Sequence, residues 1–194
     1  MGALVESSCL LAFSGLFERN LEAAGKIALQ DKLIDKYYRQ IELDCIDLIA
    51  SQSPVERDLR MLSALMQLVR DLERIGDYAK NLGDIAIKLL PYPTPPYMEH
   101  LQLMFNRCRA MLALSLGALA GLDADMGLQI KVKDDAVDQD YLLLYDLIAR
   151  QPMLKGSSPE LYMLLALAIH HLERIADHAT NIGQRVAYIV TGNR

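Results

Sequence analysis

Apolar residues recur along the chain at spacings of three and four, the period of an amphipathic α-helix. The clearest interruption is the segment 91–97 (PYPTPPY), which holds four of the seven prolines in the 194 residues. Because proline stops a helix, this segment predicts a boundary between two halves, residues 1–92 and 93–194. No other stretch interrupts the periodicity so strongly.

Each half predicts three helices. SPVE (53–56) is typical of a helix start, with Ser53 as the N-cap, Pro54 at the first position and Glu56 three residues after the cap. SSPE (157–160) predicts the start of the last helix. The remaining helices are expected at residues 2–18, from after a turn at 19–22 to about residue 51, at 98–122 and at 123–150. The predicted fold is all-α, with two tandem antiparallel three-helix bundles.

The two halves are predicted to be copies of one unit. DLERIGDYAKNLGD (71–84) returns one hundred residues later as HLERIADHATNIGQ (171–184). The second helices match at an offset of 103, which falls to 99 at the repeated DLIA, a difference of about one helical turn that keeps the same face. Small residues in the first motif, Gly76, Ala79 and Gly83, predict that another helix backbone approaches closely there.

The amino-acid composition disfavours a β-sandwich, a nucleic-acid-binding protein and a disulfide-rich protein. Hydrophobic residues make up 52% of the chain and aromatic residues only 6%, which favours helices over a β-sandwich. The net charge is −5 and no run of Lys and Arg occurs, so a nucleic-acid partner is not expected. Cys9, Cys45 and Cys108 are widely spaced and odd in number, which disfavours a disulfide framework. With no signal peptide and no spanning segment recognised, a cytoplasmic protein is expected.

Each half also carries two pairs of acids spaced four residues apart, and so on one helix face. Such like-charged pairs destabilise a helix by about 0.2–0.5 kcal/mol each, and Asp31 and Asp134 lie within the apolar stripes of their helices. Facing pairs from two helices would form an oxygen-lined cation site suited to hard metal ions. The pattern therefore predicts two metal sites. Their ligands are Asp31, Asp35, Glu73 and Asp77 in the first half, and Asp134, Asp138, Glu173 and Asp177 in the second.

Ordinary ion pairing is the alternative, because at least three of the four acid pairs have a cation three residues from one of their acids. These cations are Lys32, Arg70, Arg74 and Arg174. The repetition of four pairs in register favours the metal interpretation. A ferritin-like oxidase is disfavoured because Glu-x-x-His is absent, and no catalytic residues are predicted.

Other polar residues of the motif are expected to support the acids. These auxiliary residues are Arg74, Asn81, Asp84, Arg174 and Asn181. His171 and His178 are not expected to be ligands, because their counterparts in the first copy are Asp71 and Tyr78.

At these motifs the chain resembles the PhoU family of phosphate-uptake regulators. The likeness rests on DLERIGDYAKNLGDIA (71–86), HLERIADHATNIGQRVA (171–187), SPVERDLRML (53–62) and the duplicated acid pairs, and it covers essentially the whole chain. By this resemblance the chain is expected to begin within the family's first helix. The second copy has LKGSSPEL (154–161) in place of VERDLR, so its third helix is expected to start later.

The resemblance implies a non-enzymatic cytosolic accessory protein, with a homodimer expected. It implies contacts with the ATPase of a phosphate ABC importer and with a phosphate-sensing histidine kinase, and hence only indirect association with the membrane. It also implies metal ions, iron or zinc, bound through the acid pairs. Three alternatives stay open: a PhoU-like domain of a sodium–phosphate cotransporter system, a carboxylate-metal phosphatase, and a scaffold whose acids are merely solvated.

Overall fold

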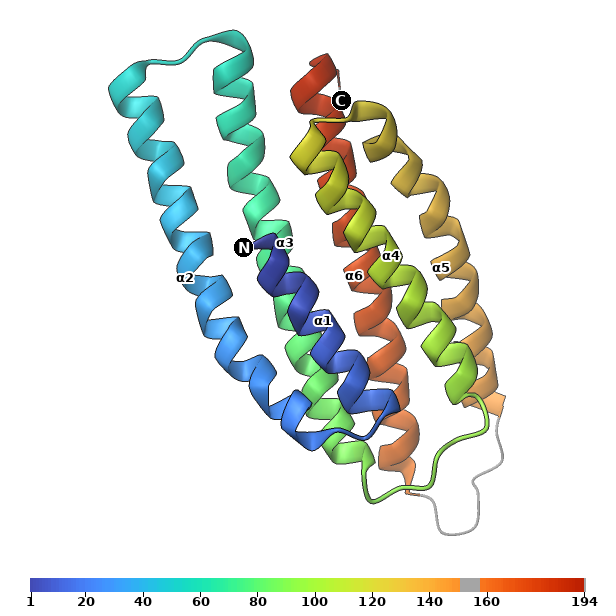
Figure 1. Ribbon diagram of the computed structural model, residues 1–194. Helices are drawn as coiled ribbons and strands as arrows, with labels where there is room; N and C mark the ends of the chain where they lie inside the picture. Colours follow the sequence, from blue (N-terminus) through green and yellow to red (C-terminus); the bar gives the residue numbers. More distant parts are fainter. Residues whose placement is uncertain (151–157, 194) are drawn as a thin grey trace.

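The computed structural model describes residues 1–150 and 158–193, which form six antiparallel helices and no strand (Figure 1). The all-α prediction is therefore confirmed, and each predicted helix is present close to its expected position. The helices are α1 (Gly2–Phe17), α2 (Leu21–Gln52), α3 (Glu56–Leu89), α4 (Met98–Gly121), α5 (Ala124–Arg150) and α6 (Pro159–Thr191).

The helices pack as two three-helix bundles, α1 to α3 and α4 to α6. The bundles meet mainly where α3 lies along α6, with a smaller contact between α1 and α4 (Figure 1). The buried apolar side chains of both bundles belong to one continuous core. The predicted division between residues 92 and 93 falls in the linker from α3 to α4, and the assignment of residues 1–92 and 93–194 as two domains stays a prediction.

Polar side chains begin three of the helices by accepting hydrogen bonds from otherwise free backbone N–H groups. Asn20 accepts from the backbone N of Ala23 at 3.1 Å, and Asp123 accepts from Met126 at 2.9 Å. Ser158 does the same for Glu160 at 3.2 Å. The α6 helix starts later in its copy than α3 does, as expected from the replaced segment. Residue 157 of the predicted SSPE start lies outside the described residues.

The predicted N-cap at Ser53 is wrong. Ser53 instead ends α2 in the left-handed conformation, with φ of 46°, and its N–H donates to the carbonyl of Ile49 at 3.2 Å. The α3 helix begins only at Glu56, and its N-cap residue Val55 has no side-chain acceptor to offer. The turn between α2 and α3 is so short that the serine closes one helix and cannot also open the next.

Glycines allow the helices to approach closely, as predicted for the first copy. A Cβ atom on Gly83 would lie 2.7 Å from Cδ1 of Ile27 in α2. The approach is closer in the second bundle, where a Cβ on Gly127 would lie 2.5 Å from the carbonyl oxygen of Gly183. The α5 and α6 backbones therefore touch, with no room for a side chain between them.

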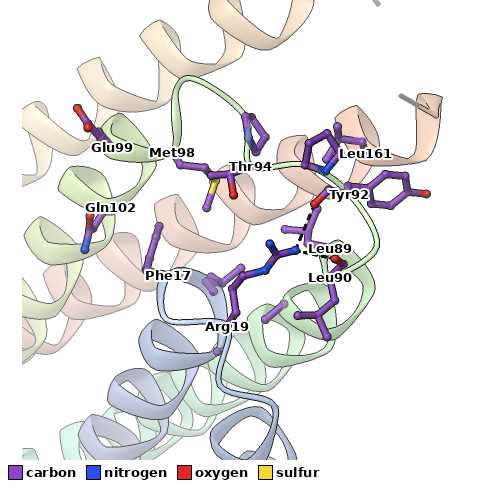
Figure 2. A pocket seen from close by; sticks show the side chains of 15 residues that line it. Phe17, Arg19, Leu89, Leu90, Tyr92, Thr94, Met98, Glu99, Gln102 and Leu161 are labelled. Carbon is purple, nitrogen blue, oxygen red and sulfur yellow. Dashed lines mark hydrogen bonds between the residues drawn. The ribbon is translucent and has the colours of Figure 1, made fainter. Parts of the chain in front are cut away.

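The linker between the bundles is tied to the rest of the molecule (Figure 2). The guanidinium of Arg19 donates to the carbonyl oxygens of Leu90 at 2.6 Å and Tyr92 at 3.2 Å. The Tyr92 hydroxyl in turn donates to Glu160 at 2.7 Å. These bonds border a cavity of about 160 Å³. Its apolar lining includes Phe17, Leu89, Met98 and Leu161.

One described helix, α4, is long and apolar enough to cross a membrane by length and composition. Many of its side chains, including Phe105 and Leu112, are fully buried in the bundle, as in the core helix of a globular protein. The three cysteines are buried free thiols. Burial raises the pKa of Cys9 to about 12, so this thiol is a poor source of the thiolate that a metal would need.

Candidate metal-binding site

The first predicted ligand set lies on the flank of the α2–α3 contact, and we call Asp31, Asp35, Glu73 and Asp77 the first acidic cluster. The neighbouring seam packs Ile34 of α2 against Gly76 of α3, which fixes the two helices beside one another. Asp31 is buried, with 7% of its surface exposed. Burial raises the pKa values of Glu73 and Asp77, and the other carboxylates of the cluster raise them further. The four acids therefore lie close enough to repel one another.

Two cations lie in the first acidic cluster. The ammonium of Lys80 donates to Asp31 at 2.5 Å, which raises the pKa of Lys80. Arg74 is less closely engaged, with nitrogens 3.7 Å from Glu73 and 3.6 Å from Asp77. Four carboxylates against two cations leave two formal negative charges in excess.

The second predicted ligand set occupies the matching flank of the α5–α6 contact. We call Asp134, Asp138, Glu173 and Asp177 the second acidic cluster. Asp134 is more deeply buried than its counterpart, at 3% exposure. Burial raises the pKa values of Asp138 and Asp177, with further increases from carboxylates on both helices. Each helix therefore contributes acids to a shared negative region.

The cations of the second acidic cluster are placed differently. Lys131 comes from the same helix as Asp134 and donates to it at 2.7 Å. Arg174 lies 2.9 Å from Glu173 and 2.7 Å from Asp177, closer than Arg74 lies to its acids. The hydroxyl oxygen of Thr180 is buried without a hydrogen-bond partner. Thr180 is the counterpart of Lys80, so the second cluster has an unsatisfied hydroxyl where the first has an ammonium.

The two lysines are the site residues that sequence reasoning missed. Lys131 could have been found, because it lies three residues before Asp134 on one helix face. Lys80 gave no such signal, because it reaches Asp31 across the α2–α3 contact and its counterpart is Thr180. Of the expected ion pairs, the two formed by Arg74 with Asp77 and by Arg174 with Asp177 are present.

The clusters fit a hard metal ion by their chemistry. Their donors are carboxylate oxygens that carry more negative charge than the neighbouring cations offset, and the second cluster adds a buried hydroxyl without a partner. Within residues 1–150 and 158–193, no three Asp, Glu, His or Cys side chains are arranged to hold a metal as they stand. Binding would therefore require the carboxylates to turn away from their lysine and arginine partners.

The predicted auxiliary residues lie between or after the acids along α3 and α6. Arg74 and Arg174 contact acids as described, whereas Asp84 is exposed. Asn81 and Asn181 are half-buried, one turn beyond the last acid of each motif. Asn181 also borders a hollow of about 520 Å³, whose polar lining includes Gln67, Gln184, Arg185 and Asn193.

An ion network crosses from α3 to α6 between the two clusters. Asp71 is 5% exposed and accepts a hydrogen bond from Arg185 Nε at 2.7 Å, while His178 Nδ1 lies 2.8 Å from its other oxygen. Arg185 also donates to Gln67 at 2.5 Å. Burial alone would raise the pKa of Asp71, but the hydrogen bonds from His178 and Arg185 and the charge of Arg185 outweigh it and lower the pKa. His178 was not predicted to be a site residue.

The other end of the same contact is aromatic. The ring of Tyr78 lies 5.5 Å from that of His171 and 5.8 Å from that of His178. The contacting residue numbers fall along α3 as they rise along α6, so the helices are antiparallel, as Figure 1 shows. The two bundles are thus related by an approximate two-fold axis near the middle of α3 and α6. This relation places both acidic clusters on the same face of the molecule.

Comparison with known proteins agrees with this duplicated architecture. A family model described as PhoU domain matches residues 1–86 and again residues 101–186. A phosphate-specific transport system accessory protein PhoU homolog of Synechocystis sp. (strain ATCC 27184 / PCC 6803 / Kazusa) is 53% identical over 194 residues. That match covers all of this chain and 86% of the relative. A Pseudomonas aeruginosa protein of the same description is 31% identical, over 99% of this chain and 80% of its own length.

Solved structures give the same result. The crystal structure of PhoU from Pseudomonas aeruginosa superposes with a TM-score of 0.94 at 31% identity, covering 100% of this chain and 93% of that chain. The phosphate transport system regulatory protein PhoU from Streptococcus pneumoniae gives a TM-score of 0.89, also at 31% identity, over 99% and 90% of the two chains. The chain belongs to the PhoU family.

Proposed function

We propose that this protein is a non-enzymatic, metal-binding regulator of phosphate uptake and of the phosphate-starvation response. The observation that carries the proposal is the match of both halves to the PhoU domain, together with relatives named as accessory proteins of phosphate-specific transport. In this proposal it acts in the cytoplasm as a homodimer, through contacts with the ATPase of a phosphate ABC importer and with a sensor histidine kinase.

The two acidic clusters would hold the metal, with iron or zinc as the expected ions. When bound, the ion supplies positive charge that offsets the repulsion among four carboxylates. The residues then act as ties between helices, because Asp31 and Asp35 belong to α2 whereas Glu73 and Asp77 belong to α3. Lys80 would have to release Asp31 for all four acids to take part.

The alternatives are less well supported. A carboxylate-metal phosphatase would need groups that activate water and bind a phosphoryl group, and the relatives are named accessory or regulatory proteins. A domain of a sodium–phosphate cotransporter would share the fold, but the relatives named here are attached by name to the phosphate-specific transport system.

The metal proposal predicts opposite effects of one substitution. Glu73→Gln should raise the melting temperature of metal-free protein at pH 7, because the raised pKa of Glu73 shows that folding disfavours its ionised form. The same change should abolish metal binding at the first cluster. For a site filled at about 100 times its Kd, the parent would lose about 2.7 kcal/mol of metal-dependent stability there. Thermal unfolding with iron, with zinc and with chelator, alongside elemental analysis, measures both effects.

The duplication supplies the matched control. Glu173→Gln should remove the metal of the second cluster alone, and the double variant should hold none. If chelated and metal-loaded parent proteins melt at the same temperature and metal content is unchanged in Glu73→Gln, the acid pairs are ordinary ion pairs.

Regulation is tested in cells that lack the protein. Deletion should raise phosphate uptake and the expression of starvation genes in phosphate-rich medium, because the proposed brake on the importer and kinase is gone. Radiolabelled phosphate uptake and a starvation-promoter reporter measure these outcomes. Re-expression of the parent chain should reverse both, and unchanged uptake after deletion would contradict the proposed regulatory role.

A further inference from the structure

The two buried aspartates are neutralised by lysines from different helices. Lys80 belongs to α3 and reaches Asp31 of α2 across the contact between these helices. Lys131 belongs to α5, as Asp134 does, and pairs with it from three residues away. The same enclosed carboxylate therefore has a cation from the facing helix in the first bundle and from its own helix in the second.

The second and third helices of each bundle pack in the same register. A Cβ atom on Gly83 would lie 2.7 Å from Cδ1 of Ile27, and one on Gly183 would lie 2.8 Å from Cδ1 of Ile130. These contacts join equivalent positions, because the glycines are 100 residues apart and the isoleucines 103, which are the offsets of the duplicated segments. Nearby residues of the two bundles can therefore be compared position by position.

Thr180 occupies the place of Lys80 in this register. Each lies three residues before its glycine, and Asp31 and Asp134 each lie four residues after their isoleucine. Position 180 therefore faces Asp134 as position 80 faces Asp31. Thr180 is 5% exposed, and its hydroxyl oxygen has no hydrogen-bond partner among the described residues. Because buried polar groups are normally paired, and threonine hydroxyls can bind hard cations, this oxygen is a candidate ligand.

The two lysines differ in how easily they can leave their aspartates. The side chain of Lys131 is 55% exposed, and an ion pair three residues apart on one helix contributes little to stability. The side chain of Lys80 is 39% exposed and joins two helices. Its departure leaves Asp31 enclosed without a partner and removes a contact between α2 and α3. A metal ion therefore competes with a stronger pair at the first acidic cluster.

The arginines act in the opposite direction, but more weakly. Arg174 lies closer to its acids than Arg74 does, which by itself would weaken metal binding more at the second acidic cluster. Both guanidinium groups pair with acids of their own helix, and their side chains are 39% and 47% exposed. Because such exposed pairs contribute little, we expect the residue that faces the buried aspartate to have the larger effect.

We propose that Lys80 competes with metal at the first acidic cluster and that Thr180 makes the second acidic cluster the tighter metal site. The inference rests on the proposed function, because it concerns how the two proposed metal sites differ. At low free metal the second cluster fills first, while Lys80 keeps the charge of Asp31 paired. At higher free metal an ion displaces Lys80 and fills the first cluster. The protein thereby responds to two ranges of metal concentration.

Zinc titration tests the order of filling. Metal-free protein is dialysed against a series of free zinc concentrations, and bound zinc is measured by elemental analysis. The variants Glu73→Gln and Glu173→Gln each leave one cluster intact, so they assign each zinc ion to a cluster. We expect two Kd values that differ by about tenfold or more, with the tighter zinc lost in Glu173→Gln and the weaker in Glu73→Gln.

Exchanging the residues at positions 80 and 180 should reverse this order. Lys80→Thr should tighten zinc binding at the first cluster by about tenfold or more, because a hydroxyl replaces the competing ammonium. Thr180→Lys should weaken zinc binding at the second cluster by a similar factor. Thr180→Val keeps the shape of the side chain and should also weaken binding there, because the hydroxyl is lost. If Thr180→Lys does not fold, Lys80→Thr and Thr180→Val decide the outcome.

Thermal unfolding separates displacement of Lys80 from a simple loss of charge. Lys80→Thr should melt below the parent in chelator, since Asp31 loses its partner, and should gain more from zinc than the parent does. Lys32→Thr is the matched control, because Lys32 is exposed on α2 directly after Asp31 and carries the same charge. This control should change the zinc affinity of the first cluster by less than about twofold.

Several results would overturn the inference and leave the metal-binding role standing. These are equal zinc affinity of the two clusters, unchanged affinity in Lys80→Thr, or equal tightening in Lys32→Thr. Unchanged affinity in Thr180→Val would overturn the assignment of its hydroxyl as a ligand. If neither cluster bound zinc or iron, the proposed metal sites would fail, and this inference with them. The deletion experiment tests phosphate regulation separately.

Discussion

Asp71 shows how a single residue can join two bundles. It is nearly inaccessible to water, yet both carboxylate oxygens are engaged by α6, by Arg185 at 2.7 Å and by His178 at 2.8 Å. A buried carboxylate without partners would be strongly destabilising, so these contacts determine whether the residue stabilises the structure. Its lowered pKa indicates that in the folded protein the charged form is favoured.

Replacing Asp71 should therefore produce a pH-dependent loss of stability. A group whose folded pKa is lowered stabilises the fold above its ordinary pKa and ceases to do so as the pH falls through the lowered value. Asp71→Asn should cost about 1–3 kcal/mol at pH 7, because Arg185 loses its charged partner. The difference from the parent should shrink between about pH 5 and pH 2, around and below the ordinary range of an aspartate.

Urea unfolding across this pH range measures the effect. The control is Asp84→Asn, because Asp84 is exposed and its counterpart is already Gln184. A difference that stayed constant at every pH would mean that Asp71 acts by shape rather than by charge.

The sequence could have suggested this network, but only indirectly. The acid pairs were found because they are identical in both copies, whereas Asp71 and Tyr78 face His171 and His178 as unlike counterparts. When the two copies are aligned, positions that hold different residues give no sign of a shared role. In the antiparallel contact they touch one another, and their differences become complementary. That pairing depends on how α3 meets α6, which the heptad pattern within each helix does not specify.

At the scale of elements, the α2–α3 contact of the first bundle and the α5–α6 contact of the second differ in how closely the two helix backbones approach. At Gly183 a new Cβ would meet the carbonyl of Gly127, a backbone atom that cannot rotate away. At Gly83 a new Cβ would meet Cδ1 of Ile27, the flexible end of a side chain. Ala24 stands where Gly127 does, so the first bundle is already slightly wider at this level.

Alanine substitutions at these two glycines should therefore affect stability differently. Gly183→Ala should destabilise the protein by about 1–3 kcal/mol, since α5 and α6 must move apart. Gly83→Ala should change stability by less than about 1 kcal/mol, because better helix propensity offsets the adjustment of Ile27. Chemical denaturation of the two variants gives the comparison. A larger loss for Gly83→Ala would show that the α2–α3 contact is the tighter one.

Helix existence was well predicted because the apolar period of each segment is long and regular. The helix starts predicted at Asp123 and within residues 157–160 agree with the structure, where Asp123 and Ser158 accept hydrogen bonds from the first turns of α5 and α6. The error at Ser53 has a physical reason: the same residue can end one helix or begin the next, and the turn length decides which. The acidic clusters followed from spacing, whereas Lys80 depended on packing between helices.

At the scale of the whole molecule, the shared core limits how separate the halves can be. The core is one cluster that includes Leu68 and Ile75 of α3 and Ile175 and Ile182 of α6. Cutting the chain at the linker would expose part of this surface on each half. The antiparallel contact of α3 with α6 is therefore a structural interface as well as a boundary.

Residues 1–92 and 93–194, produced separately, should each be helical but unfold with low cooperativity and self-associate. Mixed in equal amounts, they should form a one-to-one complex that melts cooperatively, because the α3 and α6 faces complement each other. Circular dichroism and sedimentation measure the two properties. Monomeric halves that unfold cooperatively and ignore each other would establish two independent domains.

The approximate two-fold axis between α3 and α6 affects how many partner molecules one chain can bind. A partner that contacted only features common to both bundles would find two equivalent poses, related by a half turn, and could bind in duplicate. The ion network at Asp71 and the aromatic stack at Tyr78 lie on opposite sides of this axis, at equivalent positions. The apolar residues Met163 and Leu167 occur on one bundle alone. The two acidic clusters therefore occupy equivalent positions, whereas Met163 and Leu167 distinguish the bundles, so a protein partner that contacts these two residues should bind each chain once.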